Sequence, residues 1–119
     1  MDDVAAIVAA VRAVRFRYSN EDDLQRGIAE ALRRAGIAFE REAELGDAGR
    51  IDFLATDGVA VEAKIQGSPA EVARQVVRYA GSPLVRAVVL VTGRRSLGRL
   101  PAEILGKPVA VVELWETFL

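Results

Sequence analysis

The sequence predicts a single α/β domain, residues 1–119, with the element order α-α-β-β-β-α-β-β. Three features support this prediction. Apolar residues recur at helical spacing in three segments, and two short alternating segments meet at the turn signal Asp57-Gly58. A nearly continuous apolar run at 86–92 is typical of a strand buried on both faces. About half of the residues are hydrophobic (51%), so the chain can build one core and is not disordered.

The composition excludes several kinds of site. The chain has no cysteine and no histidine, which rules out disulfides, the usual zinc sites and histidine-dependent nucleophilic catalysis. Carboxylates, lysine and oxygen-bound hard cations remain. The net charge of −1 gives no sign of nucleic-acid binding, although nearly all the cations are arginine. We find no signal peptide and no membrane-spanning run, so we expect a cytoplasmic protein, or an intracellular one if a phage encodes it.

Two helices are predicted before the first strand. An aspartate at position 2 or 3 caps the first, which extends to about Phe16. Ser19-Asn20 caps the second, 21–35, and Gly36 stops it. A strand at 37–44 and a glycine-bearing loop then lead to the central hairpin.

Polar residues extend the apolar stripe of the second helix toward its start. Glu21 and Gln25 lie seven and three residues before Ile28 and share its face, whereas Glu30 is about half a turn out of phase and faces water. Glu21 is therefore a candidate site residue, with Gln25 beside it. The alternative is that Glu21 only complements the helix dipole.

The turn between the second and third strands decides which side chains share a face. A two-residue loop would set Asp52 on the face opposite to Glu62. A three-residue loop, 56–58, with its glycine left-handed, pairs Ala55 with Val59 and sets Asp52 opposite Glu62.

We prefer the three-residue loop, because it places Asp52, Glu62 and Lys64 on one face and the aliphatic residues on the other. Two neighbouring carboxylates repel unless a cation lies between them. We expect these two within about 5–6 Å of each other, a gap that hard-cation ligand distances can bridge.

A capping box at 68–71 predicts a third helix, which ends at about residue 80. Gln75 lies within its apolar stripe, four residues before Tyr79. A buried amide needs a partner, and the alternative to a role in a site is a bond to a strand carbonyl. Arg74 and Arg78 lie one turn apart on the outer face and are candidates for phosphate contact.

The buried strand at 86–92 ends in a basic loop. Arg94 and Arg95 stand where loops often bind ligands in open α/β sheets, although solvation is the alternative role for them. Pro101–Leu105 is predicted as a helical turn and Pro108–Leu114 as a last strand. The apolar residues that follow either pack on the first helix or meet a partner: Trp115, Phe118 and Leu119.

Asp52, followed on the next strand by Glu62-Ala63-Lys64, resembles the PD-(D/E)XK nuclease superfamily. Asp52 stands at the first acidic position of that family. Glu62 and Lys64 stand at its (D/E)-x-K pair, and Ile51 replaces the nominal proline.

A second motif lies on the third helix. Gln75 and Tyr79 resemble the QxxxY motif of the RecB-like branch of the same superfamily, in which the glutamine supports the site. The resemblance covers 21–92. It implies a restriction-endonuclease-like αβββαβ core, with a mixed sheet flanked by helices, an extra N-terminal helix and a C-terminal strand.

The resemblance also implies a function, which is metal-dependent hydrolysis of phosphodiesters in DNA, including branched or otherwise structured DNA, as in small Holliday-resolvase-like members. Asp52, Glu62, Glu21 and the carbonyl of Ala63 would hold one or two Mg²⁺ or Mn²⁺ ions. Lys64 would orient or deprotonate a water, or stabilise the transition state. We expect DNA as the partner and a homodimer, because cutting two strands needs two sites.

Two alternatives stay open. In the first, Lys64 forms a structural cross-strand salt bridge with Glu62 or Asp52, which contributes little stability if it is exposed. In the second, the nuclease fold is kept as a non-catalytic module that binds nucleic acid or protein.

Overall fold

A computed structural model describes residues 2–114 and shows an α/β fold with three helices and a six-stranded mixed sheet. Within the described range, no helix is both long enough and apolar enough to cross a membrane. Trp115, Phe118 and Leu119, predicted as an apolar segment, lie outside the described residues. The helices are α1 (Asp3–Arg12), α2 (Glu21–Arg34) and α3 (Pro69–Ala80). The strands are β1 (Phe39–Glu44), β2 (Arg50–Ala55), β3 (Val59–Lys64), β4 (Ala87–Thr92), β5 (Glu103–Ile104) and β6 (Lys107–Glu113).

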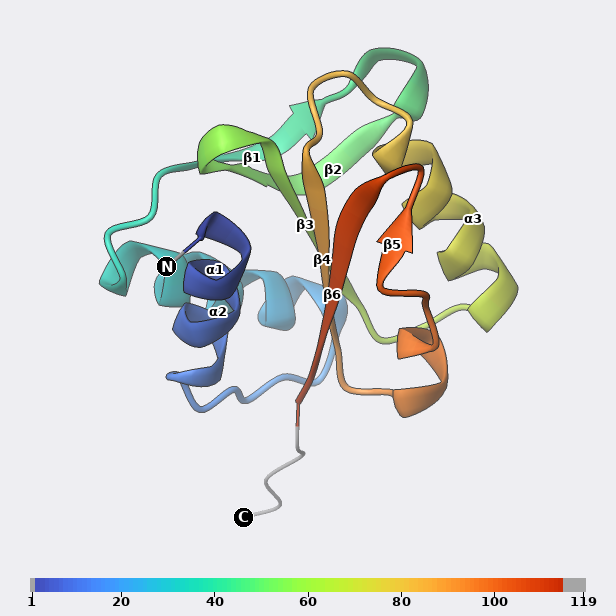
Figure 1. The fold of residues 1–119 in the computed structure, drawn as a ribbon. Coiled ribbons are helices and arrows are strands. Elements are labelled where there is room, and N and C mark those ends of the chain that lie inside the picture. The colour runs from blue at the N-terminus through green and yellow to red at the C-terminus, as the bar shows by residue number, and fades with distance from the viewer. Residues whose placement is uncertain (1, 115–119) are drawn as a thin grey trace.

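Helices cover the sheet on both faces, α1 and α2 on one and α3 on the other (Figure 1). The strand order is β1-β2-β3-β4-β6-β5. Strands β1 to β3 are antiparallel, β3, β4 and β6 are parallel, and β5 is antiparallel to β6. All six residues of β4 are buried, as its nearly continuous apolar sequence predicted, because β4 lies inside the sheet between two helical layers.

The predicted end of the first helix, about Phe16, is wrong. α1 ends at Arg12, with Ala13 as its C-cap. The Phe16 ring packs on α2 at Gly27, where an added Cβ would lie 2.6 Å from a ring carbon. The chain therefore leaves the helix axis to bring this ring against the bare backbone of α2.

The predicted helix starts of α2 and α3 are confirmed. The Asn20 side chain accepts a hydrogen bond from the Asp23 amide (2.8 Å), and Ser68 Oγ accepts one from the Glu71 amide (3.2 Å). Gly36 has a φ of 71°, which suits its position just after α2.

The helical turn predicted at Pro101–Leu105 is wrong, because β5 occupies this segment and pairs with β6. Leu105 and Gly106 connect the two strands, with φ values of 53° and 75°. Positive φ at both central residues matches the twist of a two-residue hairpin. The register of a neighbouring strand, rather than local helical preference, decides the conformation here.

The three-residue turn predicted between β2 and β3 is confirmed. Thr56–Gly58 connects the strands, Gly58 has a φ of 80°, and Ala55 pairs with Val59. The ladder continues to the pair Phe53 and Val61 and would next set Asp52 opposite Glu62. The register that we preferred is therefore the one that the chain adopts.

The alternation of faces breaks at Asp52. Phe53 belongs to the core beneath α1 and α2, whereas Ile51, which we predicted on the same face, belongs to the core beneath α3. Its β1 partner Ala43 also lies in the α3 core, and Glu42 before it has a φ of 50°. In both strands the side chains change faces at the level of Asp52, so the Asp52 side chain lies at a twist in the sheet.

We expect Gly58→Ala to be strongly destabilising. An added Cβ would lie 2.7 Å from the Leu84 carbonyl oxygen, in addition to the strain of a positive φ. Gly106→Ala is the matched control, since its φ of 75° carries the same strain with no atom within 4 Å. Strain alone costs about 1–2 kcal/mol. Urea unfolding should show a clearly larger loss of free energy for Gly58→Ala, and equal losses would contradict the close approach.

Candidate functional site

Asp52 and Glu62 are joined across the β2–β3 strand pair by two hydrogen bonds. Asp52 Oδ2 accepts from the Ala63 amide (2.8 Å), and Glu62 Oε1 accepts from the Asp52 amide (3.3 Å). Each carboxylate thus bonds to the backbone of the other strand. These contacts follow the ladder pair Phe53 and Val61, where regular strand pairing stops.

Both carboxyl groups are held at raised pKa. Glu62 is only 7% exposed, and this burial, followed by the charge of Asp52, raises its pKa to about 8. Burial also raises the pKa of Asp52, although the bond from the Ala63 amide counteracts part of the effect. Like charges this close favour a shared proton or a cation at neutral pH.

α3 supports Glu62 from one side of the sheet. The Tyr79 hydroxyl lies 3.2 Å from Glu62 Oε2 and 3.4 Å from the Arg50 carbonyl oxygen, so it can donate to either. Burial, followed by the charge of Glu62, raises the pKa of Tyr79. Gln75, one turn earlier, shares this helix face. Its side-chain oxygen is buried, and no hydrogen-bond partner for it occurs among the described residues.

α2 approaches the site from the other face through Glu21. Its Oε2 accepts hydrogen bonds from the Ile65 and Gln66 amides, both at 3.1 Å, just beyond β3. The charge of Glu21 also raises the pKa of Asp52. Glu30 is exposed and pairs with Arg34 at 3.0 Å, so the predicted phase of the helix is confirmed.

Gln25 lies beside Glu21 on α2, but its hydrogen bond leads elsewhere. Its Oε1 accepts from Arg41 Nη2 on β1 (2.7 Å), and Arg41 lies over the buried Phe53 ring. The hydrogen bond that the structure gives Gln25 therefore goes to β1, not to Asp52 or Glu62.

Lys64 is the last residue of β3, two residues after Glu62, and its side chain is half-buried. Its charge lowers the pKa of both Asp52 and Glu62. An added Cβ at Gly67 would lie 3.9 Å from Lys64 Cε, so the lysine stem extends over the turn before α3. No salt bridge within 4 Å involves Lys64 among the described residues.

The candidate arginines are placed at three locations. Arg94 Nη1 lies 3.5 Å from the Ile65 carbonyl oxygen, beside the end of β3. Arg95 instead lies 3.7 Å from Glu113 at the end of β6. Arg74 and Arg78 are exposed on α3, as predicted.

Sequence reasoning missed Thr92 and the backbone contacts. Thr92 is fully buried, pairs with Lys64 across the parallel strands, and its Oγ1 accepts from the Arg94 amide (3.1 Å). It thereby sets the start of the basic loop. The sequence signal that could have identified Thr92 is its hydroxyl group at the end of an otherwise apolar strand. The amides of Ile65 and Gln66, which hold Glu21, carry no sequence signal.

The residues present are oxygen donors of the kind that hard cations prefer. The buried carboxylate of Glu62 and the half-buried one of Asp52, both with raised pKa, fit a divalent cation. The buried Gln75 oxygen, which has no partner among the described residues, is a further donor near Tyr79. Among residues 2–114, however, no three Asp or Glu side chains converge closely enough to form a metal-binding group.

Comparisons with protein-family models, with curated proteins and with solved structures found no match for this chain.

We expect Glu21→Ala to destabilise the fold by about 1.5–3 kcal/mol, because two backbone amides lose a charged acceptor. Glu30→Ala is the control, since it removes only an exposed ion pair within α2, which contributes about 0.3–0.5 kcal/mol. Urea unfolding of both variants measures the difference. An equal, small loss would mean that Glu21 does not hold the segment after β3.

Proposed function

We propose that this chain is a metal-dependent nuclease of the PD-(D/E)XK type, with a restriction-endonuclease-like core, that hydrolyses phosphodiester bonds in DNA. One observation carries the proposal: Asp52 and Glu62 come from adjacent strands, bond to each other's backbone and are both held at raised pKa. A merely structural ion pair would set a carboxylate against a cation, whereas here a buried carboxylate, Glu62, lies against a half-buried one, Asp52. The antiparallel β1-β2-β3 meander, followed by α3 and the parallel strand β4, agrees with the core that the resemblance implies.

Asp52, Glu62 and the Ala63 carbonyl are the groups that would hold Mg²⁺ or Mn²⁺. The Ala63 amide bonds to Asp52, and the amide and carbonyl of one strand residue point toward the same neighbouring strand. When bound, such a cation neutralises phosphate charge and lowers the pKa of a water. Glu21 adds negative charge from α2, and Tyr79 orients the Glu62 carboxylate.

Lys64 supplies the positive charge of the site. Because none of the described carboxylates pairs with it, its ammonium group is available to donate to a phosphate oxygen or to orient a water. A preoriented cation near developing negative charge lowers the barrier more than it strengthens ground-state binding.

Arginines supply the contacts to the DNA backbone in this proposal. Arg94 is held at the end of β3 beside Lys64, and Arg74 and Arg78 present further cations from α3. Guanidinium groups can bind phosphate oxygens bidentately. A homodimer would bring two such sites to a duplex.

One observation favours a second candidate function, a non-catalytic module that binds nucleic acid or protein. Glu21 bonds to two backbone amides, and in residues 2–114 it does not complete a three-carboxylate group with Asp52 and Glu62. Such a module would bind DNA equally well with and without divalent cations and would not cut it.

The deciding experiment incubates the purified chain with linear, nicked, flapped and four-way DNA in Mg²⁺, Mn²⁺ or EDTA. We expect cleavage with either cation and none with EDTA. Asp52→Asn, purified in parallel, controls for contaminating nucleases. Cation-independent binding without cleavage of any substrate would favour the non-catalytic module.

A further inference from the structure

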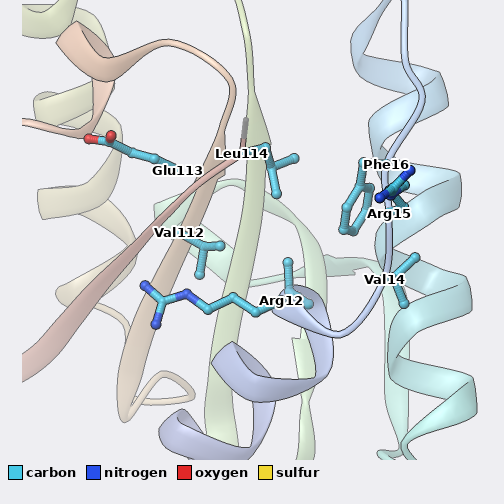
Figure 2. Close-up of a pocket in the computed structure, with 8 residues that line it drawn as sticks. Arg12, Val14, Arg15, Phe16, Val112, Glu113 and Leu114 are labelled. Carbon is cyan, nitrogen blue, oxygen red and sulfur yellow. The ribbon is translucent and has the colours of Figure 1, made fainter. Parts of the chain in front are cut away.

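An apolar groove lies between the end of α1 and the end of β6 (Figure 2), and neither Asp52 nor Glu62 lines it. Its volume is about 240 Å³. Phe16 and Leu114 project toward one another across it, and Val112 lies deeper on β6. Its apolar lining comes from α1, the connection to α2, and β6: Val11, Val14, Phe16, Val112 and Leu114.

The groove exists because α1 ends early. Had the helix continued to Phe16, Val14 would lie on its regular stripe. Instead the chain unwinds after Ala13 to bring Phe16 onto Gly27, and Val14 is left half-buried at the groove. Leu114 is half-buried as well, and half-buried apolar side chains gain stability when further apolar surface covers them.

We propose that residues 115–119 of the same chain fill this groove with their apolar side chains. Leu114 lines the groove and directly precedes this segment, so the segment begins at the site that it would cover. Its five residues can extend at most about 17 Å. Three of the five are large and apolar: Trp115, Phe118 and Leu119. A tethered segment also has a high effective concentration compared with any separate partner.

Charge supports the same occupant. Arg12 and Arg15 stand at the groove, and both are exposed. Glu113, the acidic residue at the groove, lies 3.7 Å from Arg95 in the loop after β4. The groove therefore keeps a net positive rim, which complements Glu116 in the proposed occupant.

The chain contains a built-in reporter, because Trp115 is its single tryptophan. Fluorescence and acrylamide quenching should be measured on the full chain over a range of protein concentrations. We expect blue-shifted emission and a several-fold lower quenching constant than in the urea-unfolded chain, independent of concentration. Emission and quenching equal to those of the unfolded chain would overturn the proposal. Protection that disappears on dilution would also overturn it and would assign the groove to a second copy.

Two variants test whether the groove is the place where residues 115–119 bind. Val14→Asp, in the groove, and Phe118→Asp, in the segment, should each shift the Trp115 emission toward the unfolded value. Phe118 belongs to the segment itself and lies outside the described residues, so Phe118→Asp still tests the proposal if Val14→Asp fails to fold. Val77→Asp is the control, because Val77 is already 45% exposed on α3, on the other face of the sheet. Protection of Trp115 that survives both groove and segment variants would contradict this placement.

Discussion

Lys64→Ala is expected to lower the rate of metal-dependent DNA cleavage by about two to three orders of magnitude, because a preoriented cation at the reacting phosphate is lost. Divalent-cation binding and DNA binding should remain close to wild type, since Lys64 forms no salt bridge within the described chain. Single-turnover cleavage, Mn²⁺ titration calorimetry and DNA-binding titrations measure the three quantities separately.

Two variants serve as controls for this result. Lys107→Ala removes the other lysine of the chain, whose ammonium donates to the Ser82 carbonyl, and should leave cleavage unchanged. Asp52→Asn keeps an acceptor for the Ala63 amide but should lose cation binding together with cleavage. A Lys64→Ala protein that cuts at the wild-type rate would show that Lys64 has no part in the chemistry.

The second large effect concerns the pH dependence of stability without divalent cations. In the folded chain the pKa of Glu62 is about 8, against 4.5 as its ordinary value. Between these values the folded state keeps a proton that the unfolded state has released. The stability from this group is therefore complete below about pH 4.5 and is lost as the pH rises through 8. Since each pKa unit corresponds to about 1.4 kcal/mol, the loss is on the order of a few kcal/mol.

Glu62→Gln mimics the protonated side chain and should remove this loss. We expect the variant to be more stable than wild type at pH 8, with the difference shrinking toward pH 5, in urea unfolding curves measured in EDTA. Glu30→Gln controls for the general effect of removing a carboxylate, since Glu30 is exposed. A stability difference between Glu62→Gln and wild type that does not change with pH would contradict the raised pKa.

Divalent cations should compensate for the same loss in the wild-type chain. If Asp52 and Glu62 hold Mn²⁺, adding it at pH 8 should raise the melting temperature, since a ligand that binds only the folded state stabilises it. Glu62→Gln should lose most of this increase. No increase in the wild-type chain would count against the proposed cation site while leaving the pKa prediction intact.

The sequence by itself determined the features that depend on neighbours along the chain. Turn chemistry at 56–58 and strand alternation gave the register that sets Asp52 opposite Glu62. Helical phase separates Glu21, whose face meets the end of β3, from Glu30, which faces water. These patterns are visible because a strand repeats every two residues and a helix every 3.6, so a side chain's face follows from its position.

Tertiary packing decided what those side chains meet. Gln25 shares a helix face with Glu21, yet it bonds to Arg41, because the Arg41 side chain on β1 comes within 2.7 Å of it. α1 ends before Phe16, because the Phe16 ring packs on α2 at Gly27, which has no side chain. The faces of β2 reversed at Asp52, where two strands twist together. Each outcome depends on residues distant in sequence, whose packing outweighs the small energies of local preference.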